Sequence, residues 1–275
     1  MAGIDPLAQT PASARLSIGD VEHIGGSLGA GALVICDHAS NAIPAELDGL
    51  GLPAAQLTRH IAYDIGAAWL SRRLANRLGC PAILSNFSRL LIDPNRGLDD
   101  PTLVMRLSDG AIVPGNAMLD ESGIAERIAR YYEPYDSAIA EAVSLAISAG
   151  FPPALISIHS FTPFWKGQPR PWHVGLLWEG DDRLTAPLFA ALRAEDGLVV
   201  GDNEPYAGYL EGDTIDRHAR RHGLPNLLIE VRQDLIASQA DAEAWGDRLA
   251  RMLLPILADW RAGLLRPLAN APAGA

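Results

Sequence analysis

The sequence predicts an α/β fold of three layers, in which helices cover both faces of a mostly parallel sheet. Three observations support this prediction. Short apolar runs alternate with longer amphipathic stretches, the runs are apolar enough to be buried on both faces, and no internal repeat or change of composition divides the 275 residues. Because α/β domains of roughly 200 to 250 residues are common, we expect one domain over 1–275, with tails at about 1–20 and 267–275.

The first half of the chain contains three expected strands and one expected helix. The run ALVICDH, residues 32–38, is apolar until its last two positions and is typical of a buried strand. Residues 67–79 place apolar side chains at helical spacing and end on glycine, which favours a helix. The short apolar runs PAILSNF, 81–87, and LLIDPN, 90–95, predict two further strands.

The second half repeats this alternation. Helical periodicity returns over 123–150, where we expect an interruption at Pro134, because proline lacks the N–H of a helical hydrogen bond. The remaining elements carry the same two signatures, with strands expected at 154–159, 173–180 and 226–232 and helices at 186–197 and 241–263.

Composition restricts the class of partner. Acidic residues outnumber basic ones 33 to 22, and no tract rich in Lys or Arg occurs, which argues against nucleic acid and anionic membranes as partners. Two cysteines are too few for a disulfide framework. No stretch has the pattern of a signal peptide or of a membrane span. We therefore expect a cytoplasmic protein that acts on a small molecule.

Charged or metal-binding side chains lie at the ends of four expected strands. In parallel sheets, ligands bind beyond the carboxyl ends of the strands, so these side chains should meet at one edge. Two histidines and a carboxylate, with a second carboxylate as base, are the usual groups of a hydrolytic zinc site. The groups concerned are Asp37 and His38, Asp93 to Arg96, His159 and Ser160, and Glu230 with Arg232.

An ordered set of motifs resembles the N-formylglutamate amidohydrolase family over roughly residues 31–234. The resemblance implies a mixed sheet like that of the zinc carboxypeptidases, whereas the strand pattern alone leaves an all-parallel sheet open. It also implies zinc or another divalent metal, and hydrolysis of a small N-acyl amino acid such as N-formylglutamate. The motifs are DHASNAIP, RHIAYDIG, SRLLIDPNRG, IHS, GYLEGDTIDRHARRHG and LIEVRQ.

The resemblance implies that His38 and His159 are metal ligands. For the third ligand two residues remain open. Asn41 follows the first histidine by three residues, where the carboxypeptidase pattern has a glutamate, but a neutral amide is a poor ligand for zinc. Asp64 matches an acidic position of the family and is the better candidate, with the start of a helix as its alternative role.

The glutamate of the last strand is the candidate general base. Glu230 lies within an apolar run, where an ionised carboxylate is costly unless it is paired. As the base of the resembled site it would take a proton from water and pass it to the leaving amine. The alternative is a salt bridge with Arg232.

Substrate contacts are expected from a cluster of polar residues. Arg96, with Asn95 beside it, resembles the Asn-Arg pair that binds a substrate carboxylate, and a guanidinium suits bidentate binding. An ion pair of Arg96 with Asp99 or Asp100 is the alternative. The further substrate-binding candidates are Arg89, Ser160 and Arg217.

Three other functions remain open at this point. Cys36, two residues before His38, is a possible nucleophile of a cysteine amidase, although a small buried side chain is its ordinary role. The chain is also compatible with a carboxypeptidase-like hydrolase of another small amide or peptide. The last alternative is a non-catalytic protein that binds a small ligand and has a degenerate metal site.

Overall fold

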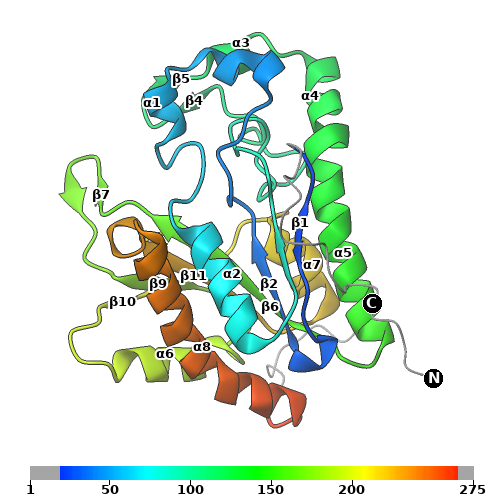
Figure 1. The fold of residues 1–275 in the computed structure, drawn as a ribbon, viewed down its shortest axis with the longest axis vertical. Coiled ribbons are helices and arrows are strands. Elements are labelled where there is room, and N and C mark those ends of the chain that lie inside the picture. Colours follow the sequence, from blue (N-terminus) through cyan, green and yellow to red (C-terminus); the bar gives the residue numbers. More distant parts are fainter. Residues whose placement is uncertain (1–18, 266–275) are drawn as a thin grey trace.

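The computed structural model describes residues 19–265, so most of the two expected tails lies outside the described part. A seven-stranded sheet has the order β1-β3-β2-β6-β11-β9-β10 (Figure 1). The strands β3, β2, β6 and β11 run parallel, β9 and β10 run parallel to each other, and β1 and β9 are antiparallel to their neighbours β3 and β11. The strands are β1 (Glu22–Ile24), β2 (Ala32–Cys36), β3 (Ala82–Leu84), β6 (Ala154–Phe161), β9 (Val174–Leu177), β10 (Val200–Asp202) and β11 (Asn226–Arg232).

Helices cover both faces of this sheet, which confirms the predicted three-layer α/β fold with a mixed, mostly parallel sheet (Figure 1). On β2, Val34 and Cys36 pack with one set of helices, and Leu33 and Ile35 pack with the other. The first set is α2 (Ala67–Leu78), α6 (Thr185–Arg193) and α8 (Gln239–Arg261), and the second includes α5 (Glu133–Ser148) and α7 (Thr214–His218).

Short elements complete the described chain. They include two hairpins outside the main sheet and several single-turn helices, and their length makes them invisible to a search for periodicity. They are η1 (Leu28–Ala30), η2 (Ala45–Gly51), α1 (Ala54–Leu57), β4 (Leu107–Ser108), β5 (Ala111–Ile112), α3 (Pro114–Ala117), β7 (Phe164–Trp165), β8 (Gln168–Pro169), η4 (Arg220–His222) and η5 (Gln233–Leu235). Within residues 19–265, no helix combines the length and the apolar character that crossing a bilayer requires.

The expected strand at residues 90–95 is wrong, because this segment is a buried loop. The backbone N–H of Leu91 donates to the carbonyl of Ser88 at 2.9 Å, and that of Asp93 donates to the carbonyl of Leu103 at 2.8 Å. The side chains of Leu90, Leu91 and Ile92 are fully buried in the core on the α5 face. The apolar composition of the segment indicates burial, and a buried loop has the same composition as a buried strand.

The expected interruption at Pro134 takes the form of a π-helical turn. The turn η3 (Ile128–Tyr132) joins α4 (Glu121–Arg127) directly to α5, and Pro134 lies in the first turn of α5. At Glu133 the backbone N–H donates to the carbonyl of Ile128, five residues earlier. The wider turn accommodates the proline ring without ending the helix.

Two glycines with positive φ offer a matched test of backbone packing at the start of α2. Gly66 (φ 82°) precedes α2, and a Cβ there would lie 2.2 Å from the carbonyl oxygen of Ile236. Gly79 (φ 66°) follows α2, and a Cβ there would meet nothing within 4 Å. Gly79→Ala should cost only about 1–2 kcal/mol for its backbone conformation. Gly66→Ala should cost clearly more, as measured by urea unfolding, and equal losses would contradict a rigid contact with Ile236.

Candidate active site

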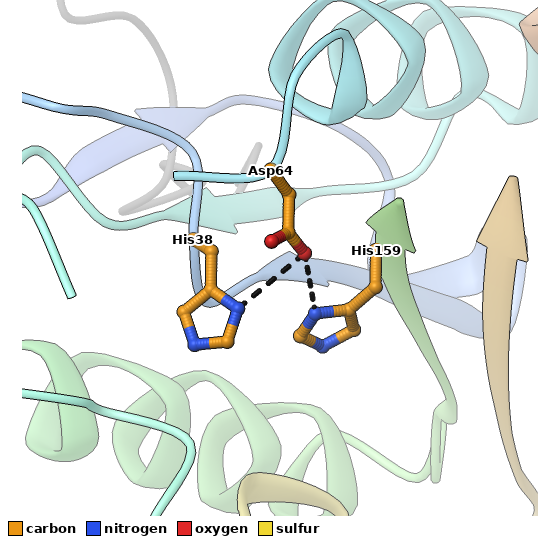
Figure 2. A group of neighbouring side chains, drawn as sticks. All are labelled: His38, Asp64 and His159. Atoms are coloured by element: carbon orange, nitrogen blue, oxygen red, sulfur yellow. Dashed lines mark hydrogen bonds and ion pairs between the residues drawn. The ribbon is translucent and has the colours of Figure 1, made fainter. Parts of the chain in front are cut away.

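Three buried side chains converge near the carboxyl ends of the central strands (Figure 2). His38 follows β2 by two residues, His159 lies on β6, and Asp64 lies three residues before α2. Oδ2 of Asp64 is 3.4 Å from Nδ1 of His38 and 2.8 Å from Nδ1 of His159. The structure therefore brings together the three residues that the sequence suggests as metal ligands.

Asp64, and not Asn41, is the third member of this group. The side-chain amide of Asn41 donates to the carbonyl of Leu57 at 2.8 Å. The backbone N–H of Asp64 donates to the carbonyl of His38, and its own carbonyl accepts from Ala67 at the start of α2. The backbone of Asp64 thus takes part in the start of α2, while its carboxylate is left free to face the two histidines.

Two further buried carboxylates hold the histidines from behind. Nε2 of His38 lies 2.7 Å from Oδ1 of Asp93, and Nε2 of His159 lies 3.2 Å from Oδ2 of Asp37. These contacts turn both Nδ1 atoms towards Asp64. A carboxylate on the far ring nitrogen is the usual way in which proteins orient a metal-binding histidine. The sequence placed Asp37 and Asp93 at this edge but gave them no role, since only the ring orientations identify it.

Asp37 also connects other parts of the site. Its carboxylate accepts hydrogen bonds from Thr214 Oγ1 at 2.7 Å and from the hydroxyls of Ser157 and Tyr135 at 3.2 Å each. Burial alone would raise the pKa of Asp37, but His159, the charge of His38 and the hydroxyl of Thr214 outweigh it and lower the pKa to about 2. Asp37 is therefore a fixed negative charge behind His159.

The donor atoms of His38, Asp64 and His159 fit a divalent metal. One nitrogen or oxygen from each lies within 4.8 Å of the others. Tetrahedral zinc, with ligands at about 2.0–2.1 Å, separates neighbouring donors by about 3.4 Å, which is close to the 3.4 Å and 2.8 Å from Oδ2 of Asp64 to the two Nδ1 atoms. Burial disfavours charge on His159, but its hydrogen bonds to Asp37 and Asp64 raise its pKa well above the usual value. A cation in this group would take the place of that proton.

Glu230 lies beside His159 on the same face of the sheet. The two residues are partners in the register of the parallel strands β11 and β6. Within the described chain, Oε2 of Glu230 is buried and has no hydrogen-bond partner, while Arg232 pairs with Asp234. Burial raises the pKa of Glu230 to about 7, against the opposing effect of His159. A carboxyl group that titrates near neutral pH is suited to proton transfer.

These groups line one cavity of about 360 Å³. Its wall also includes apolar and aromatic side chains from β9, β11 and the loop 206–213. The lining residues are His38, Asp64, Arg89, Asn95, Arg96, His159, Ser160, Leu177, Tyr206, Ala207, Tyr209, Leu210, Asp213, Leu228 and Glu230.

Arg89 brings positive charge to the metal-binding group. Its Nη2 contacts Oδ2 of Asp93 at 2.5 Å, and its Nη1 lies 3.2 Å from Nδ1 of His38 and 3.8 Å from Oδ1 of Asp64. Burial would raise the pKa of Asp93, but Arg89 and His38 hold it well below the usual value. On the other side of Asp64, Ser160 donates its backbone N–H to Oδ2 at 3.3 Å.

Asn95 and Arg96 also line this cavity. Asn95 accepts from the backbone N–H of Thr214 through its Oδ1 at 3.0 Å. The guanidinium of Arg96 donates to Thr102 Oγ1 and to the carbonyl of Asn95, both at 3.1 Å. Its distance to Asp100 is 4.0 Å, so the alternative ion pair is present only as a long contact.

Comparison with known proteins identifies the family to which this chain belongs. Residues 30–237 match the family model for N-formylglutamate amidohydrolase. The chain belongs to this family. Its resemblance to the family in sequence is therefore confirmed, and amide hydrolysis is the activity that the family represents.

Two solved structures are similar to this member of the N-formylglutamate amidohydrolase family. The crystal structure of gene product Atu2144 from Agrobacterium tumefaciens has 32% identity and a TM-score of 0.81, covering 88% of this chain and 96% of that one. N-formylglutamate amidohydrolase from Ralstonia eutropha JMP134 has 22% identity and a TM-score of 0.68, covering 90% and 100%. Curated protein sequences gave no match.

Two residues that the sequence suggested lie away from the cavity of this family member. Arg217 does not line it and donates instead to the carbonyls of Pro94 and Arg96. Cys36 is fully buried in the core on the α2 face, where burial raises the pKa of its thiol. A protonated thiol inside the core argues against the cysteine-amidase alternative.

In the metal-free protein, Glu230 should destabilise the fold as pH rises. The folded state retains a proton on Glu230 up to a pKa of about 7, whereas the unfolded state releases it near the usual value of 4.5. Relative to Glu230→Gln, wild type should therefore lose on the order of 2–3 kcal/mol of unfolding free energy as pH rises through this range.

Urea unfolding of chelator-treated protein at about pH 5 and about pH 8 measures this loss. Glu141→Gln, at an exposed position on α5, is the control and should show no such change with pH. A constant difference between wild type and Glu230→Gln at both pH values would show that Glu230 ionises as freely in the folded protein as in the unfolded chain.

Proposed function

We propose that this protein is a metal-dependent amidohydrolase that cleaves the amide of a small N-acyl amino acid, with N-formylglutamate as the leading substrate. The main support is one juxtaposition: the partnerless Oε2 of Glu230 lies in the same cavity as a His-Asp-His group and as Arg96. Family membership supports amide hydrolysis, and a similar structure carries the name N-formylglutamate amidohydrolase.

The metal would be held by His38, Asp64 and His159, with zinc the first choice for two imidazoles and a carboxylate. A divalent metal in such a site supplies a Lewis acid for the amide carbonyl and acidifies the attacking water. Asp37 and Asp93 would keep the imidazoles oriented through their Nε2 atoms.

Glu230 would act as the general base. Its carboxylate would take a proton from the attacking water and deliver it to the leaving nitrogen. Burial without a hydrogen-bond partner leaves Oε2 available for this transfer, and the raised pKa brings its basicity close to that needed at neutral pH.

Arg96 and Asn95, which line the cavity, would bind the substrate carboxylate. Arg89 and Ser160 lie beside Asp64, and we propose that they contact the acyl amide. A volume of about 360 Å³ suits a small amino-acid derivative. The net charge of −11 does not prevent anion binding, because distant surface charges are screened beyond about 8 Å at physiological salt.

Metal titration tests the proposed ligands without any assumption about substrate. Asp64→Asn should weaken zinc binding by more than the roughly 10- to 100-fold that loss of an outer hydrogen-bond partner costs. Asn41→Ala should leave zinc affinity unchanged, because its amide is bonded to Leu57. Titration of chelator-treated protein measures both variants, and a loss at Asn41 equal to that at Asp64 would overturn the ligand set.

Two substitutions test the reaction itself on N-formylglutamate and on an analogue whose carboxylates are amidated. Glu230→Gln should retain metal but lose roughly 10²- to 10⁴-fold in kcat, since an amide cannot accept the proton. Arg96→Ala should lower kcat/KM for the carboxylate substrate by roughly 10- to 100-fold and leave the neutral analogue almost unaffected.

Normal turnover by Glu230→Gln would remove the general-base assignment. Equal losses on the charged and neutral substrates would show that Arg96 does not recognise a carboxylate.

A further inference from the structure

The turn that carries Asn95 and Arg96 rests on the guanidinium of Arg217. Nη2 of Arg217, on α7, donates to the carbonyl of Pro94 at 2.9 Å, and Nη1 donates to the carbonyl of Arg96 at 3.1 Å and also contacts the carbonyl of Gly212. Nε donates to Oδ1 of Asp136 at 2.9 Å. All three guanidinium nitrogens of Arg217 therefore have hydrogen-bond acceptors. Two of these acceptors, the carbonyls of Pro94 and Arg96, belong to the residues on either side of Asn95.

A second side chain supports the same turn. The hydroxyl of Tyr132 donates to the carbonyl of Arg96 at 2.8 Å, and its ring lies 5.1 Å from the guanidinium carbon of Arg217. Arg217 and Tyr132 thus meet at a single carbonyl oxygen. Thr214 completes the contact, because its backbone N–H holds Asn95 while its hydroxyl binds Asp37 behind His159.

The side chain of Arg96 needs this support. Its own hydrogen bonds are to the neutral oxygens of Thr102 and Asn95, and its nearest carboxylate, Asp100, is 4.0 Å away. A guanidinium binds a carboxylate in a bidentate manner only if its plane is correctly placed, and small displacements are costly. The backbone of residues 94–96 therefore sets where Arg96 points.

We propose that Arg217 is the positioning residue of the substrate-carboxylate site: it acts through the backbone of residues 94–96 and does not touch the substrate. This inference rests on the proposed function of Arg96. It differs from a direct anchor, since Arg217 is outside the cavity lining and its nitrogens are occupied. It also differs from a plain ion pair with Asp136, which would affect stability alone.

Kinetics of Arg217→Met tests the inference, because methionine keeps much of the apolar stem but removes every donor. KM for the carboxylate substrate should rise about 10-fold or more with little change in kcat, and the preference over the neutral analogue should fall by the same factor. Zinc affinity should be unchanged. Arg251→Met, which breaks an exposed ion pair with Glu195, is the matched control and should behave as wild type.

Tyr132→Phe gives a milder second variant in case Arg217→Met fails to fold. It removes one hydrogen bond to the carbonyl of Arg96 and keeps the ring. The same loss of preference, in smaller measure, is expected. Unchanged KM and preference in the folded variants would overturn the inference.

A double substitution separates positioning from direct contact. If Arg217 acts only through Arg96, the pair Arg96→Ala and Arg217→Met should bind the carboxylate substrate no worse than Arg96→Ala alone. Losses that multiply would identify Arg217 as a second anchor and overturn the positioning role.

Hydrogen exchange of the full chain, without substrate, decides the structural part independently of the reaction. The backbone amides of Asn95, Arg96 and Asp100 are hydrogen-bonded within the turn and should exchange faster in Arg217→Met than in wild type or Arg251→Met. Unchanged exchange would overturn the inference. Faster exchange together with an Arg96→Ala variant that keeps the wild-type preference for the carboxylate substrate would instead place the error in the function proposed for Arg96.

Discussion

Burial of several carboxylates at one end of the sheet is the constraint on which the site depends. Asp37, Asp64, Asp93 and Glu230 are each at most 6% exposed, and an isolated ionised group in such surroundings is strongly disfavoured. The neighbouring groups of the site stabilise these buried carboxylates. Arg89 supplies positive charge, His159 contacts both Asp37 and Asp64, hydroxyl groups surround Asp37, and the three converging donor atoms leave a natural place for a cation. Glu230 has the fewest stabilising contacts of the four carboxylates, and burial therefore raises its pKa to about 7.

The two-residue period of the strands separates this chemistry from the bulk of the core. On β11, Leu227, Ile229 and Val231 pack in the core with α2, α6 and α8, while Leu228 and Glu230 face the cavity. On β6, Ile156 and Ile158 pack in the same core, while His159 faces the cavity. One face of the sheet can therefore be dry and tightly packed, while the other carries charged groups at the ends of the same strands.

Strand endings made much of the fold and half of the site predictable from sequence. A polar residue that closes an apolar run must emerge at the sheet edge, which located His38 and His159, whereas Glu230 was identified as a costly carboxylate within an apolar run. Asp64 precedes a helix and has no periodic signal of its own, so only the family resemblance indicated it. The loop 90–95 was mistaken for a strand, because its leucines are as buried as those of β6. Contacts between distant parts of the chain, such as the hydrogen bonds from Arg217 to the carbonyls of Pro94 and Arg96, depend on tertiary packing, which no local sequence pattern indicates.

The π-helical turn η3 has a consequence for how one long helix serves two loops. Arg127, before the turn, donates to the carbonyl of Leu91 and to Asn116, and Tyr132, at its end, holds the carbonyl of Arg96. In a regular α-helix, residues five apart point about 140° away from each other. The wider turn, whose hydrogen bond runs from Glu133 to Ile128 five residues earlier, reduces this angle. The same sequence wound as a regular α-helix would keep Arg127 and Tyr132 on different sides of the helix, so that only one of the two loops could be contacted.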